Sequence, residues 1–113
     1  MEFESLSEVD KTILGQALRA AADGPFFPDW EFQTLFGLER SKVRAIAGAW
    51  PKPIASPEEM TIAVNNSLNM LLRYPHRKDD VWSQWISVER QQLNELFNRL
   101  RGGPDERVFD RLL

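Results

Sequence analysis

The single histidine of the chain lies in a cluster of aromatic and cationic residues whose chemistry suits an anion. Arg73, Tyr74, His76 and Arg77 fall within five consecutive positions, interrupted only by Pro75. Guanidinium groups bind carboxylates and phosphates through paired hydrogen bonds, and an imidazole changes charge near neutral pH. We therefore expect this segment either to bind an anion or an acidic partner, or to form a solvated loop after a helix, where the helix dipole favours cations.

The residue types that catalysis and metal binding require are scarce. The sequence has no cysteine and only one histidine, so thiolate chemistry and the usual zinc ligand sets are excluded. Adjacent carboxylates such as Glu58 and Glu59 diverge on a helix instead of converging on one substrate. We expect no catalytic residues, no metal and no cofactor. An enzyme that uses His76 and Tyr74 as acid–base groups is the least favoured of three hypotheses.

Residues 29–48 resemble a helix-turn-helix motif. Such a motif joins two short helices through a tight turn that contains glycine, with apolar anchors on both helices. Gly37 would provide the turn, and the anchors would be Phe32, Phe36, Leu38, Val43 and Ile46. The same spacing also arises wherever two helices pack, so the motif predicts either a DNA-binding unit or a packing unit. Four residues of its second helix would face DNA or a protein partner, namely Arg40, Ser41, Lys42 and Arg44.

Hydrophobic periodicity and capping residues predict an all-α fold, a small bundle of about five helices joined by short loops. The clearest helix start is Ser56, which would cap a helix that has Pro57 in its first turn. Gly24 and Pro51 are expected to end two of the helices. The predicted helices run from Ser5 or Ser7 to Gly24, from Trp30 to Phe36, from Arg40 to Trp50, from Ser56 to Tyr74 and from Ser87 to Arg101.

Two further segments have more than one interpretation. Residues 81–86 fit a helical turn, because two tryptophans lie three positions apart, or a minor β element, because the segment is rich in β-forming residues. Residues 104–113 fit a short docking helix or a frayed tail. Polar amides in the middle of the fourth helix are also unusual, and Asn66 or Asn69 could hold a neighbouring loop in place, for example the loop at residues 74–76.

Length and charge indicate one domain with unevenly distributed charge. The 113 residues fit a single helical domain over residues 1–113, and we identify no internal repeat. The net charge is −3; residues 1–36 contain seven acidic and two basic residues, whereas residues 37–56 contain four basic and one acidic. No apolar run approaches the roughly 20 residues of a membrane span, and the N-terminus is acidic. We expect a cytoplasmic protein without membrane contact.

The leading functional hypothesis is a non-enzymatic protein-interaction or regulatory module, of the adaptor or inhibitor kind. It is based on the missing catalytic residues, the divided charge and the many aromatic residues. Four tryptophans are a high number for this length, and one or two of them could lie at a surface that binds another protein. The alternative is a helix-turn-helix DNA-binding protein that uses residues 29–48.

Overall fold

The structure, a computed structural model, describes residues 3–102, and these residues form six α-helices and one short 3₁₀-helix without any strand. The predicted all-α fold is confirmed, with one α-helix more than the five expected. The elements in chain order are α1 (Glu8–Asp23), α2 (Asp29–Phe36), α3 (Arg40–Ala49), α4 (Pro57–Arg73), η1 (Asp79–Val81), α5 (Trp82–Trp85) and α6 (Arg90–Leu100).

Residues 82–85 form the short helix α5, as one of the two predictions for residues 81–86 has it. The other prediction, a minor β element, is wrong. Trp82 and Ile86 are both buried, and a separation of four residues places them on one face of a helical turn. The indole Nε1 of Trp82 donates to the carbonyl of Val88 at 2.9 Å, which draws the following loop onto this turn. The proposed docking helix at residues 104–113 lies outside the described residues.

The two long helices begin at the caps that the sequence indicates. Ser7 caps α1, where its hydroxyl accepts a hydrogen bond from the backbone of Asp10 at 3.1 Å. Ser56 and Glu59 form a complete capping box at the start of α4. Both arrangements satisfy backbone N–H groups that a helix start leaves without partners.

The last helix begins two residues later than predicted. Glu89, not Ser87, caps α6, and it forms a capping box with Gln92. Ser87 has another role, because its backbone N–H and its hydroxyl both donate to Oε1 of Gln16, each at 2.9 Å. Ser87, which the sequence indicated as a helix cap, therefore makes a tertiary contact with α1 instead.

The six helices form two copies of one three-helix arrangement, so the expectation of no internal repeat is wrong. The first unit contains α1, α2 and α3, and the second contains α4, α5 and α6. Corresponding residues are 50 positions apart: α3 begins at Arg40 and α6 at Arg90. Burial follows the same offset across the second and third helices of each unit. Few residues are identical at this offset, and four of the identities are Pro25 and Pro75, Asp29 and Asp79, Glu39 and Glu89, and Arg40 and Arg90.

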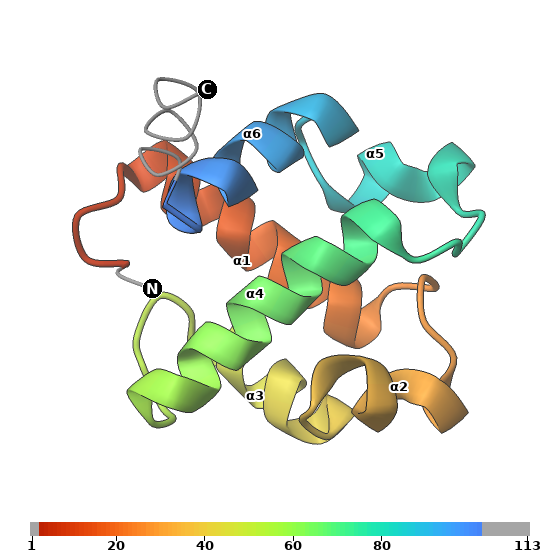
Figure 1. The fold of residues 1–113 in the computed structure, drawn as a ribbon, viewed down its shortest axis with the longest axis horizontal. Coiled ribbons are helices and arrows are strands. Elements are labelled where there is room, and N and C mark those ends of the chain that lie inside the picture. The colour runs from red at the N-terminus through yellow and green to blue at the C-terminus, as the bar shows by residue number, and fades with distance from the viewer. Residues whose placement is uncertain (1–2, 103–113) are drawn as a thin grey trace, which may run out of the picture.

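The two units pack reciprocally. α1 and α4 cross at the centre, with α2 and α3 on one side of the pair and α5 and α6 on the other (Figure 1). The short second helix of each unit contacts the long first helix of the other unit, α2 against α4 and α5 against α1. Side chains at equivalent positions make these contacts: Asn66 donates to the carbonyl of Phe36 at 2.7 Å, and Gln16 accepts from Ser87. Asn66 thus holds the end of α2, and not the loop at residues 74–76.

One hydrophobic core runs through both units. Its buried side chains come from all six α-helices and from the connector between α1 and α2. Phe26 of that connector and its counterpart His76 contact each other edge to face, with ring centroids 4.9 Å apart. Equivalent residues that touch in this way mark the place where the two units meet. The two three-helix units therefore share their interior.

Candidate functional site

Arg40, which was expected to face a DNA or protein partner, points instead into the fold. Its Nη1 donates to the carbonyl of Ala22 at 2.8 Å, and its Nη2 donates to the carbonyl of Phe27 at 2.7 Å. Its Nε lies 2.8 Å from Oδ1 of Asp29, and its Cζ lies 4.3 Å from the centre of the Phe32 ring. Only 17% of the side chain is exposed. The expected outward orientation is wrong, because the guanidinium satisfies carbonyls at the end of α1.

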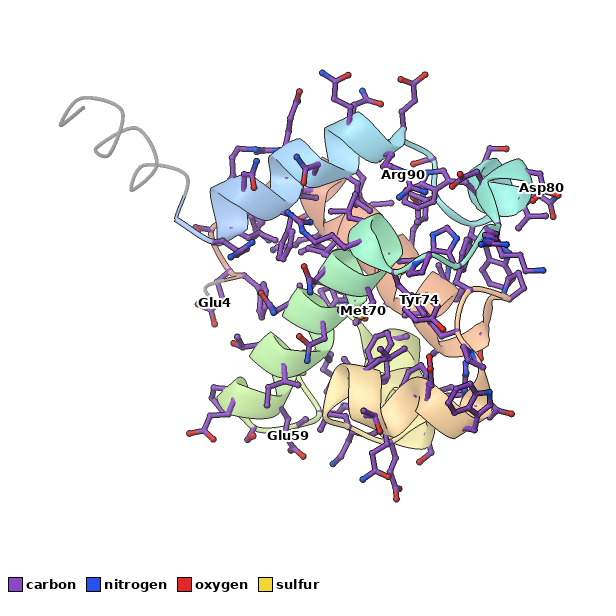
Figure 2. All side chains as sticks on the ribbon, turned by 45° about the vertical axis from the view of Figure 1, so that its right-hand side comes forward. Glu4, Glu59, Met70, Tyr74, Asp80 and Arg90 are labelled. Atoms are coloured by element: carbon purple, nitrogen blue, oxygen red, sulfur yellow. The ribbon has the colours of Figure 1, made fainter. Side chains whose placement is uncertain are left out.

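Arg90 makes most of the same contacts in the second unit, but the bond from Nη2 of Arg40 to the Phe27 carbonyl has no counterpart among them. Its Nη1 donates to the carbonyl of Leu72 at 2.9 Å, its Nη2 pairs with Asp79, and its Cζ lies 4.9 Å from the centre of a Trp82 ring. Figure 2 places Arg90 at the start of α6, near the turn that carries Asp80. We call each set an arginine clamp. A clamp ties the end of the first helix in its unit to an acid and an aromatic residue of the next helical segment, through an arginine that the third helix carries.

The other basic residues of α3 lie on the surface and pair with acids of the same chain. Nε of Arg44 lies 2.7 Å from Oδ1 of Asp23, and Nζ of Lys42 lies 3.5 Å from Oε2 of Glu59. Ser41, the residue before Lys42, is exposed. The positive charge that the sequence places on this helix is thus accompanied by negative charge from α1 and α4.

The cluster at residues 73–77 is divided among separate roles. The Arg73 guanidinium lies 5.9 Å from the centre of the Phe97 ring, and Arg77 is exposed, with a positive φ of 57°. The hydroxyl of Tyr74 donates to Glu31 at 2.6 Å, and this bond with the carboxylate raises the pKa of Tyr74 above its ordinary value of 10.0. These side chains therefore do not converge on one anion site.

His76 is buried, and both of its ring nitrogens contact the backbone. Nδ1 accepts a hydrogen bond from the backbone N–H of Lys78 at 3.0 Å. Nε2 lies 3.1 Å from the carbonyl of Leu71, a distance at which a protonated nitrogen donates to that oxygen. The imidazole packs against both Phe26 and Trp82. This arrangement supports a structural role, and it leaves neither nitrogen directed at a substrate.

The most exposed large apolar side chain of the described residues belongs to Trp30, which is 80% exposed. Trp30 begins a face of α2 that continues through Gln33, Thr34 and Gly37, all of them exposed. Ile62 of α4 borders this face, with its Cγ2 3.9 Å from the position that a Cβ of Gly37 would occupy. We call these five residues the Trp30 face. It contains no charged side chain.

The equivalent face of the second unit is polar. Its residues, 50 positions from those of the Trp30 face, are Asp80, Ser83, Gln84, Ser87 and Thr12. The two apolar residues of the Trp30 face thus correspond to an acid and a threonine. The sequence predicted that one or two of the four tryptophans could lie at a binding surface, without indicating which. Its 80% exposure separates Trp30 from the other three tryptophans, which are buried or packed against the core.

Comparisons with known protein families, with curated proteins and with solved structures find no match for this chain. Over residues 3–102, no helix is long and apolar enough to cross a membrane. The same residues contain no group of three or more histidine, aspartate or glutamate side chains that could hold a metal ion.

Proposed function

We propose that the protein is a non-enzymatic interaction module that binds another protein through the Trp30 face. The observation that carries the proposal is the 80% exposure of Trp30. An indole in water forgoes a burial free energy of about 2 kcal/mol, and tryptophan is among the residues that most often dominate binding at protein interfaces.

The charges around the Trp30 face indicate which charge the partner surface should have. Asp29 precedes Trp30 with an exposed carboxylate, and Glu39 follows the turn at Gly37, also exposed. A suitable partner surface has an apolar pocket for the indole and basic groups at its rim, because opposite charges guide association and fix orientation.

The arrangement of the arginines does not favour the DNA-binding alternative. Arg40 is used inside the arginine clamp, and Arg44 and Lys42 pair with carboxylates. Duplex binding depends on cations that are free to replace the counterions of phosphates. Acids beside the α3 cations oppose that exchange.

The test compares variants of the two equivalent faces. Wild-type protein, Trp30→Ala and the matched control Ser83→Ala are each used to capture partners from cells that express the protein, with quantification by mass spectrometry. We expect proteins that are retained by wild type and by Ser83→Ala and are reduced at least tenfold with Trp30→Ala. Equal capture by all three contradicts the proposal. Binding to sheared duplex DNA that Lys42→Ala with Arg44→Ala abolishes would favour the alternative.

A further inference from the structure

Two arginines of the second unit lie against one phenylalanine ring, at the surface where α4 packs against α6 (Figure 1). The Cζ atom of Arg73 lies 5.9 Å from the centre of the Phe97 ring, and that of Arg101 lies 4.9 Å from it. Phe97 is 1% exposed, whereas both arginine side chains are exposed. One buried ring therefore keeps two guanidinium groups on the same part of the surface.

These two guanidinium groups have no acidic partner in the part of the chain that the structure describes. Over residues 3–102, no carboxylate oxygen lies within 4.0 Å of Arg73 or Arg101. Other arginines of the second unit differ in this respect, because Arg99 pairs with Asp10 and Arg90 pairs with an acid of η1. A guanidinium has five N–H donors, so those of Arg73 and Arg101 are available to an anion.

The first unit shows a carboxylate at the equivalent place. Arg73 occupies the position of Asp23, at the offset of 50 residues. Nε of Arg44 lies 2.7 Å from Oδ1 of Asp23, and the counterpart of Arg44 in the second unit is Asn94. The first unit thus supplies both charges of an ion pair between the end of its first helix and its third helix. The second unit has a guanidinium and a neutral amide there, without the acid.

The second unit also has additional positive charge at this surface. Phe97 corresponds to Ala47 and Arg101 corresponds to Pro51, so the ring and the second guanidinium have no equivalent in the first unit. Glu95 is the one acid of α6, and it lies two positions before Phe97, about 200° around the helix from it. The acids of α4 lie in its first turn, at the opposite end from Arg73. No acid of either helix therefore lies beside the two guanidinium groups.

We propose that Arg73 and Arg101 bind an acidic segment of a partner protein, with a carboxylate at each guanidinium. A carboxylate accepts two parallel N–H bonds from a guanidinium, and arginine is enriched at the centres of protein interfaces. Two neighbouring cations attract a segment with several acids more strongly than they attract a single carboxylate. This Arg73–Arg101 site belongs to the second unit and shares no residue with the Trp30 face.

A labelled acidic peptide tests the site. The probe is hexaglutamate with a fluorescent label, and fluorescence anisotropy at low ionic strength measures its binding to the full chain. Arg73→Gln with Arg101→Gln should lower the affinity at least tenfold, because both paired donors are lost. The matched control Arg19→Gln with Lys52→Gln removes the same charge at exposed positions outside the site, and it should bind like wild type. Circular dichroism checks that each variant is folded.

A second variant separates paired hydrogen bonds from charge alone. Arg73→Lys with Arg101→Lys keeps both charges without the planar fork of donors, and its affinity should lie between those of wild type and the glutamine variant. Equal losses in the glutamine variant and in its matched control would mean that only net charge matters, which overturns the proposal. A wild-type protein that does not bind the probe also overturns it.

Two further variants relate the site to the rest of the chain. Trp30→Ala should bind the probe like wild type, so the outcome here is distinguishable from that for the Trp30 face. Asp105→Asn with Glu106→Gln removes acids that follow Arg101 in the sequence, and it should leave the affinity nearly unchanged. Several-fold tighter binding by this variant would assign the arginines to acids of the same chain and overturn the proposal.

Discussion

The first and second units have the same framework and different surfaces. Both contain an arginine clamp, a buried aromatic residue beneath the arginine and a polar residue that holds the other unit. Outside this framework, the first unit exposes Trp30, whereas the second has Asp80 at the equivalent place. The shared features maintain the fold, and the differing features are where a specific function can reside.

The two arginine clamps differ in burial, which predicts the largest difference between the units. The Arg40 side chain is 17% exposed, and the Arg90 side chain is 41% exposed. Arg40→Met should lower the free energy of unfolding by about 3 kcal/mol, and Arg90→Met by about half as much, because water screens and replaces the contacts of the more exposed arginine. Urea denaturation of both variants measures this. Equal losses would show that burial does not distinguish the clamps.

His76 and Phe26 occupy equivalent positions with different chemistry. His76→Phe makes the second unit like the first, but it removes the partner of the Lys78 N–H and one partner of the Leu71 carbonyl. We expect a loss of about 1 kcal/mol in unfolding free energy, since a partly buried donor is left unpaired. Thermal unfolding with circular dichroism checks the loss. A variant as stable as wild type would mean that a phenyl ring alone suffices at this position.

The reciprocal polar contacts between the units should contribute unequally. The Asn66 bond to the carbonyl of Phe36 is partly buried, whereas the Gln16 bonds to Ser87 are exposed. Asn66→Ala should therefore cost about 1 kcal/mol and Gln16→Ala about 0.5 kcal/mol. Denaturation midpoints with an unchanged slope provide the comparison. A larger effect at Gln16 would contradict this order of the two contacts.

The smallest effect concerns Tyr74, whose counterpart Gly24 has no side chain. The bond from the Tyr74 hydroxyl to Glu31 raises the pKa of Tyr74, so this bond stabilises the fold below the ordinary pKa of 10.0. Its contribution is lost as the pH rises through the raised pKa. Tyr74→Phe should thus be slightly less stable than wild type at pH 7, and the two should converge in strongly alkaline solution. A constant difference at all values of pH would contradict this linkage.

Much of the secondary structure was predictable because its signals are local. A serine three residues before a glutamate, a proline in the first turn and a glycine after an apolar face act within one helical turn, and α1, α2, α3 and α4 lie close to their predicted ranges. The spacing of Phe32, Phe36, Val43 and Ile46 likewise predicted which side of α2 and α3 is buried. The predicted start of α6 was wrong because Ser87 does not cap this helix but contacts Gln16, which is far away in the sequence.

The amino-acid sequence by itself determined the helical class, the starts of the first four helices and the apolar faces, because these depend on neighbours within four residues. Only the tertiary structure decided the direction of Arg40, the exposure of Trp30 and the pairing of the two units. An arginine on a short helix has the same local signals whether it faces DNA or the carbonyls at the end of α1. The direction of Arg40 depends on where α1 ends in space. The carbonyls that it binds there belong to residues some 20 positions earlier in the chain.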